Sequence, residues 1–197
     1  MAVAMMSLPL SACAIDLQGI LGKAGDAVEG VVDGLLTNDN ITVEQMAGTW
    51  KSTGSAVAFQ SDNLLKKAGG GAAANTIEKK LDSYYKKFGL NNATLTVTKE
   101  GKFTLKADKI TLNGTVTKRS DGNFDFTFTP FGNMKLGSVK TYVTKSPSGL
   151  NVMFDASKLM SILSTLSGMV NNSTLSTMSD LLNGYDGLCV GFAFKKG

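Results

Sequence analysis

The sequence predicts a mainly β protein with added helices, built on an eight-stranded antiparallel up-and-down barrel. From residue 93 onward the apolar residues recur with a period of two, which is the period of a strand. Six consecutive predicted strands are joined by short turns. One strand before them and one after them can pair and close the sheet, which removes both edges. The eight strands are expected near 49–58, 93–99, 102–107, 110–118, 123–129, 134–145, 149–155 and 187–195.

The strands are recognised by their alternation and by the turns between them. Leu95 and Val97 alternate with threonines, and Glu100 and Gly101 form the tight turn that follows. In the first strand, Gly54 is expected to mark a β-bulge. The barrel domain as a whole is expected to cover residues 45–197.

Helical spacing interrupts the strands twice. Residues 61–89 include a helix that carries Ile77 and Leu81 on one face, and residues 156–183 contain two helices. We expect both helical insertions to lie outside the barrel or across one of its mouths.

Residues 15–44 are interpreted as an amphipathic leader helix over 15–36, followed by a linker. Apolar residues recur at helical spacing, and acidic residues lie mainly between them. The leader either packs on the barrel domain or serves as a tether and spacer. In the last strand, Cys189, Gly191 and Ala193 face outward and are small and uncharged, so a further element, most simply a helix, should cover them.

Residues 1–14 are apolar and uncharged, as in the core of a signal peptide. Leu10-Ser11-Ala12-Cys13 resembles the bacterial lipobox, which implies a lipid on the Cys13 sulfur and attachment to a membrane. Two alternatives stay open: cleavage at Ala12-Cys13-Ala14 to release a soluble chain, or a disulfide from Cys13 to Cys189. All three predict an exported protein, either periplasmic or anchored to the outer membrane, or otherwise secreted.

Gly48-Thr49-Trp50 resembles the G-x-W signature of lipocalins and related calycins. In that family the glycine lets the chain bend into the first strand, and the tryptophan packs across the closed barrel end. The usual arginine partner is missing, because Arg119 lies mid-chain, so a lysine stem or an apolar helix residue should pack on Trp50. The chain is similar over 45–197 to lipocalin-like secreted or lipid-anchored proteins of gut bacteria, which implies a fold and a compartment but no particular activity.

Composition argues against several classes of function. The chain has no histidine, and its two cysteines are too few and too far apart for a metal motif, so we expect neither a metal nor a cofactor. With a single arginine, nucleic acid is not an expected partner. Asp125 should point outward from its strand and Asp155 should cap a helix. These two carboxylates therefore do not form an acid/base pair, and we do not expect an enzyme.

Two functions remain. The first is an exported binding protein for a small apolar or amphipathic ligand held inside the barrel. The candidate lining residues are Phe103, Leu105, Phe124, Phe126, Phe128, Phe154 and Phe192. The alternative is an envelope protein-interaction module or inhibitor whose barrel is filled by its own side chains, with a partner that the sequence does not identify.

Overall fold

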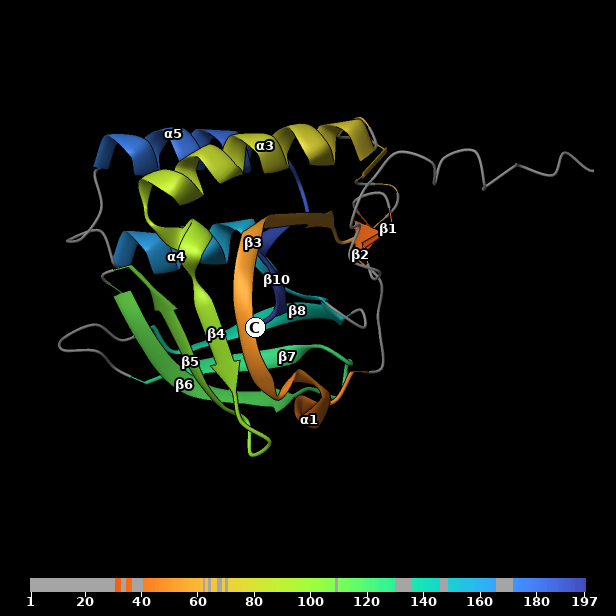
Figure 1. Cartoon of the computed structure of the whole chain (residues 1–197). Coiled ribbons are helices and arrows are strands. Elements are labelled where there is room, and N and C mark those ends of the chain that lie inside the picture. The colour runs from red at the N-terminus through yellow and green to blue at the C-terminus, as the bar shows by residue number, and fades with distance from the viewer. Residues whose placement is uncertain are drawn as a thin grey trace, which may run out of the picture.

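The barrel is closed by eight antiparallel strands (Figure 1). The computed structural model describes residues 31–32, 35–36, 41–61, 63, 65–66, 69, 71–108, 110–129, 136–145, 149–165 and 172–197. Its strands run in the order β3-β10-β9-β8-β7-β6-β5-β4, and pairing of β3 with β4 completes the barrel. The bounds are β3 (Gly48–Phe59), β4 (Thr94–Val97), β5 (Lys102–Ala107), β6 (Ile110–Lys118), β7 (Phe124–Phe128), β8 (Ser138–Lys145), β9 (Gly149–Asp155) and β10 (Leu188–Lys196).

The predicted bulge at Gly54 is confirmed. Ala193 pairs with Gly54 and Phe194 with Ser52, so Thr53 is the extra residue on β3. The strand expected from residue 134 begins only at Ser138. Gly137 precedes it with φ +69°, a left-handed conformation that does not continue a strand. Residues 134 and 135 lie outside the described residues.

The end of the predicted leader helix is wrong. Val31–Val32 forms β1 and Leu35–Leu36 forms β2, and the two strands pair antiparallel, with Val32 opposite Leu35. Strand β2 continues the sheet by pairing parallel with β3, where Leu35 lies opposite Phe59. The two residues between the strands are Asp-Gly in the sequence, a pair that favours a two-residue hairpin over a helix. The remainder of the leader, residues 15–30, lies outside the described residues.

One end of the barrel is closed by the short helix α1 (Val43–Met46). Thr42 and Gln45 form a capping box that fixes where this helix begins. Trp50 is buried next to it, and its indole Nε1 donates a hydrogen bond of 2.8 Å to the Met46 carbonyl. Trp50 therefore lies at the barrel end that α1 closes, with the buried side chain of Met46 in the same hydrophobic cluster.

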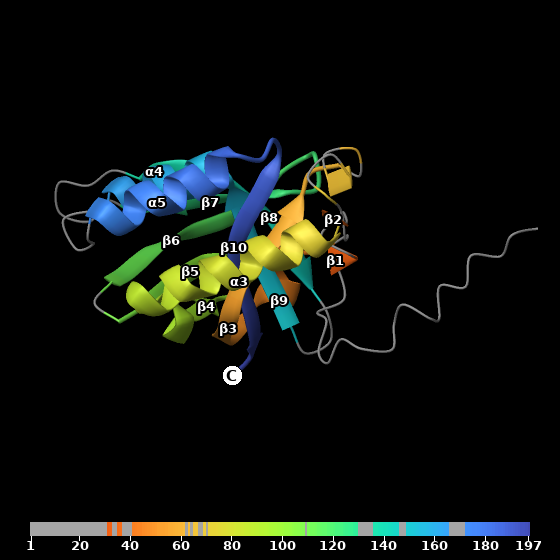
Figure 2. The same ribbon diagram turned by 90° about the horizontal axis from the view of Figure 1, so that it is seen from above.

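Three longer helices cover the opposite mouth (Figure 1). They are α3 (Gly71–Lys87), α4 (Ala156–Thr165) and α5 (Asn172–Asn183), and the one-turn helix η2 (Leu90–Asn92) follows α3. From above, α3 crosses β10, while α4 and α5 lie side by side (Figure 2). Their buried side chains join the hydrophobic cluster of the barrel interior: Ala74, Ile77, Leu81, Tyr85, Leu159, Ile162, Leu163, Met178 and Leu182. The helices therefore act as a plug of this mouth.

Polar contacts fix α3 on the barrel rim. Ser55 of β3 donates from both its backbone nitrogen and its hydroxyl to the Asp82 carboxylate, each at 2.8 Å. The Ser55 hydroxyl also lies 3.1 Å from the Glu78 carbonyl. From the next turn of α3, the buried Tyr85 hydroxyl donates to the Gly191 carbonyl of β10 at 2.8 Å. Because these groups are buried or partly buried, their hydrogen bonds hold the helix in one position.

Replacing Glu78 with glutamine should raise stability at neutral pH. Burial, and then repulsion from Asp82, raises the pKa of Glu78. A group whose pKa is raised in the folded state contributes fully to the free energy of unfolding below its unfolded-state pKa. This contribution is lost as the pH rises through the folded-state pKa. We expect Glu78→Gln to raise the free energy of unfolding by up to about 1 kcal/mol at pH 7, and by less at pH 4. Urea unfolding at the two pH values measures both changes.

Glu100→Gln serves as the control. The hydroxyl of Thr98 and a backbone hydrogen bond lower the pKa of Glu100. The contribution of Glu100 to the free energy of unfolding therefore has the opposite pH dependence to that of Glu78. If the Glu78→Gln variant were less stable than the parent at pH 7, the unfavourable burial of the Glu78 carboxylate and its repulsion from Asp82 would be contradicted.

Candidate functional site

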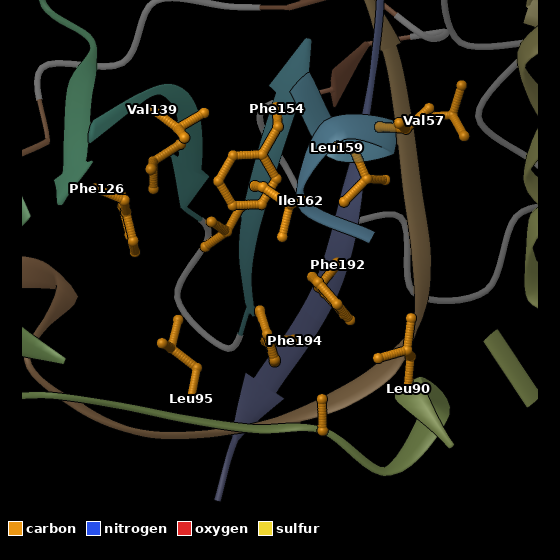
Figure 3. Close-up of a cluster of buried hydrophobic side chains, with 14 of the residues drawn as sticks. Val57, Leu90, Leu95, Phe126, Val139, Phe154, Leu159, Ile162, Phe192 and Phe194 are labelled. Carbon is orange, nitrogen blue, oxygen red and sulfur yellow. The ribbon is translucent and has the colours of Figure 1, made fainter. Parts of the chain in front are cut away.

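The predicted lining residues do face the barrel interior, but they enclose almost no space. Phe103, Leu105, Phe126, Phe128, Phe154 and Phe192 surround a void of about 10 Å³, together with Leu95, Val152 and Phe194. Phe124 is buried in the same hydrophobic cluster but does not line this void. In Figure 3, Leu159 and Ile162 from α4 lie beside Phe154 and Phe192, so the plug helices contribute to the filling.

The interior is packed ring against ring. The Phe103 ring lies 4.9 Å from Phe126 and 5.4 Å from Phe128, measured between centroids. On the other side, Phe192 stacks on Phe194 at 5.6 Å, and Tyr85 from α3 reaches Phe192 at 5.1 Å. Such tilted and edge-to-face contacts add stability beyond simple burial.

A void of about 10 Å³ accommodates at most one water molecule. Small-molecule sites usually have about 300–1,000 Å³. In this conformation the barrel is therefore filled by its own side chains, and the interior could take a ligand only if α3, α4 or the phenylalanines moved.

A much larger hollow lies on the outside, between the outward face of β8 and the length of α4. This β8–α4 groove has a volume of about 520 Å³. It is lined by Gln60, Leu136, Ser138, Val139, Lys140, Tyr142, Asp155, Ser157, Lys158, Ser161, Ile162 and Thr165. Its size is that of a small-molecule site.

The β8 side of the groove carries an ordered charge network. Lys140 forms an ion pair with Asp121 at 3.0 Å, and its Nζ lies 5.3 Å from the centre of the Tyr142 ring. Arg119 contacts Asp121 and also holds both carboxylate oxygens of Asp125, at 3.0 and 2.9 Å. The hydrogen bond from Lys140 holds the pKa of Asp121 below its usual range. Asp125 is therefore tied up in an ion pair, as a structural residue would be.

The α4 side of the groove carries Lys158, a cation without an acidic partner in the part of the chain that the structure describes. Asp155 caps α4, as predicted, by accepting from the Ser157 backbone nitrogen at 3.0 Å and from its hydroxyl. Gln60 donates weakly to the other Asp155 oxygen at 3.4 Å. Lys158 is exposed, and among the described residues it forms no ion pair. Its ammonium group is therefore available at the groove.

Cys189 lies close to the groove but is not reactive. Its side chain is fully buried and is a free thiol. Burial raises the pKa of Cys189 to about 12, so almost no thiolate is present at neutral pH. The alternative of a bridge to Cys13 involves a residue outside the described ranges.

Within the described residues, no group of three or more acidic or cysteine side chains could hold a metal ion. In the same part of the chain, no helix is both long and apolar enough to cross a membrane.

The model of the lipocalin-like domain family DUF4923 matches residues 20–196. The chain belongs to this family. Its closed eight-stranded barrel, with Gly48 and Trp50 at one end, is consistent with a lipocalin-like fold. No curated protein matches the sequence.

Among solved structures, this lipocalin-like chain aligns with a crystal structure of a DUF4847 family protein from Bacteroides vulgatus ATCC 8482. The two are 14% identical, and the alignment covers 79% of this chain and 98% of the other, with a TM-score of 0.37. This score is too low for a shared fold to be concluded.

The sequence predicted a ligand site inside the barrel. It did not predict the residues of the β8–α4 groove. They come from three parts of the sequence: Gln60 just after β3, β8 with Leu136 just before it, and the end of β9 with α4. The only local signal was Asp155, two residues before Ser157 at the start of a helical pattern, and this signal predicts a cap but not a binding site.

Proposed function

We propose that this chain is an exported lipocalin-like binding protein, and that its ligand is a small amphipathic molecule with an anionic group. In this proposal the ligand occupies the β8–α4 groove rather than the barrel interior. The contrast between the two volumes, about 520 Å³ outside and about 10 Å³ inside, is the observation that carries the proposal.

The lining of the groove supports this class of ligand. The half-buried Leu136 provides apolar surface on which a short hydrocarbon or ring can pack, and the edges of Val139 and Ile162, each 7% exposed, add to it. Lys158 provides a positive charge that no described acidic side chain pairs with, and neighbouring serine hydroxyls such as that of Ser161 can donate to an anionic head group. An apolar floor with a few polar groups is the usual composition of a small-molecule site.

Dodecanoate is a suitable probe, with dodecanol as its uncharged counterpart. We expect Lys158→Gln to weaken dodecanoate binding about fivefold to tenfold, because one charge-assisted hydrogen bond is lost, and to leave dodecanol binding unchanged. Isothermal titration calorimetry measures both. Lys51→Gln, an exposed lysine of β3 that does not line the groove, is the matched control and should bind like the parent.

Equal affinity of the Lys158 and Lys51 variants for dodecanoate would contradict a role of the groove cation. Failure of the parent protein to bind either probe would contradict the ligand class.

The filled interior favours a second candidate, a protein-interaction module of the cell envelope. If the barrel serves only as a rigid support, the function lies on its outer surfaces, including the plug helices. Native mass spectrometry of the protein purified from its own host separates the two candidates. A retained small molecule supports the binding protein, and a co-purified protein at fixed stoichiometry supports the interaction module.

Export with a lipid on Cys13 is part of the proposal and rests on Leu10-Ser11-Ala12-Cys13. The exported chain should partition into detergent and carry acyl mass on its first residue, because each buried CH₂ contributes about 0.8 kcal/mol to membrane affinity. Cys13→Ser should leave the chain uncleaved or soluble, as intact mass measurement after phase separation would show. A soluble parent chain that begins at Ile15 would instead support cleavage after Ala14.

A further inference from the structure

We propose that the outer side of α3 is a docking surface for a membrane that carries anionic lipids. Two pairs of lysines lie on this side, which we call the α3 lysine face: Lys79, Lys80, Lys86 and Lys87. The second pair follows the first by seven residues, about two helical turns, so all four lie on one side of the helix. None of them lines the β8–α4 groove, so the inference does not depend on the ligand proposed there.

The positive charge of the α3 lysine face is not neutralised by neighbouring side chains. All four lysines are exposed, and none forms an ion pair with an acidic side chain in the described ranges. The acidic residues of α3 lie on its barrel side. Asp82 accepts from Ser55 of β3, and the half-buried Glu78 lies one turn earlier. The exposed side of α3 therefore presents positive charge alone.

The strands beside α3 extend this positive surface. The helix η2 joins α3 to β4, whose first residue, Thr94, pairs with Lys51 of β3 on one side and with Lys106 of β5 on the other. Both lysines are exposed and have no ion pair within the described part of the chain, while the exposed Asp108 beside Gly89 adds one negative charge. Figures 1 and 2 show α3, β3 and β4 on the same side of the molecule. The positive surface is thus broader than a single helix.

The residue types favour a lipid surface over a folded partner. A lysine ammonium is a point charge on a flexible stem, whereas arginine is the usual residue for two-pronged recognition of a fixed phosphate or carboxylate. The single arginine, Arg119, is bound to Asp121 and Asp125. The half-buried Tyr84 lies beside the α3 lysine face, with the Lys87 ammonium 5.6 Å from its ring centre. Tyrosine is enriched at the membrane–water interface because one end of its ring is apolar and the other is polar.

Co-sedimentation with lipid vesicles tests the proposal, using the full chain with Cys13→Ser so that no lipid is attached to it. Each lysine near an anionic surface strengthens binding about fivefold, which is about 1 kcal/mol. We expect binding to phosphatidylcholine vesicles that contain about one third phosphatidylglycerol, and at least about tenfold weaker binding to pure phosphatidylcholine. Raising the salt concentration to about 0.5 M should weaken binding to the anionic vesicles, because salt screens exposed charges.

Lys79→Gln combined with Lys80→Gln should weaken binding to the anionic vesicles at least about tenfold. Glutamine is about as good a helix former as lysine, so the double variant should stay folded. Lys99→Gln combined with Lys145→Gln is the matched control, removes the same charge and should bind like the parent. Lys99 lies in the turn between β4 and β5 and Lys145 at the end of β8, so neither belongs to α3.

A fluorescent label shows which side of the protein meets the lipid. Ser83 is exposed on α3 between the two pairs of lysines. An environment-sensitive nitrobenzoxadiazole group attached to Ser83→Cys should therefore shift its emission to the blue on anionic vesicles. The same label on Thr117→Cys, an exposed position of β6, should not shift. The thiol of Cys189 is buried and should not take up the label.

Three results would overturn the proposal: no binding to the anionic vesicles, equal binding by the two double variants, or a blue shift confined to the label at position 117. Binding to heparin without binding to vesicles would assign the α3 lysine face to an acidic glycan and would overturn the proposal as well.

Discussion

Trp50→Ala should lower the free energy of unfolding by about 3–5 kcal/mol, the usual cost of removing a large buried aromatic side chain. Trp50 is 2% exposed and is among the largest fully buried side chains of the described core. The substitution also leaves the Met46 carbonyl without the indole donor at 2.8 Å. Chemical denaturation followed by circular dichroism measures the change without requiring the tryptophan as a probe.

Trp50→Phe separates packing from hydrogen bonding at this position. It retains most of the apolar surface but loses the hydrogen bond to Met46, so we expect a loss of about 1–2 kcal/mol. A loss below about 1 kcal/mol for Trp50→Ala would place the ring at the periphery, because surface substitutions fall in that range.

Gly114→Ala should be comparably destabilising, by about 3 kcal/mol or more, because the added methyl group has no space. Gly114 lies on β6 beneath the Phe103 ring, and its Cβ would lie 2.7 Å from that ring and overlap the Thr127 carbonyl. A ring can shift, but a paired backbone carbonyl cannot without breaking the sheet. Thermal and chemical unfolding both measure the loss.

Gly184→Ala is the matched control outside the barrel. A Cβ at Gly184 would meet its nearest neighbour at 3.7 Å, an ordinary contact, so a change below about 1 kcal/mol is expected. If Gly114→Ala were as mild as Gly184→Ala, the barrel interior would contain more free space than the packing of Phe103 indicates.

The barrel itself could be predicted from the sequence because its signals are local. Period-two alternation, short turns and the G-x-W sequence at Gly48 and Trp50 each depend on a few neighbouring residues. For the same reason most strand limits were predicted closely, although β8 begins at Ser138 rather than at residue 134. Strand β5, for example, was expected at 102–107 and runs from Lys102 to Ala107.

The hairpin of β1 and β2 was missed because two patterns overlap. Val31, Val32 and Leu35 fit the helical spacing of the segment before them, and the same residues flank an Asp-Gly pair. Strand β2 is also held by its long-range pairing with Phe59, which no local pattern contains. Tertiary pairing and turn chemistry therefore overrode the helical periodicity.

The sequence could not show whether the barrel is hollow. A phenylalanine at an inward position lines a pocket or fills it, depending on side chains from other strands and on the plug helices. Gly114 is one of the few signals, since a glycine within a strand can mark a close approach such as that of Phe103. Residues of β8 and α4 line the β8–α4 groove together only in the folded chain, and no local motif encodes that arrangement.

The most direct test of the account is methyl NMR of the full chain during titration with dodecanoate. The account predicts chemical-shift changes at the methyl groups of Leu136 and Thr165, which line the groove and are not among the buried core side chains. Methyl signals of Leu95, Leu105 and Val152, which surround the filled interior, should stay in place. Changes concentrated in these interior methyl groups would contradict the account and would show that the ligand opens the barrel.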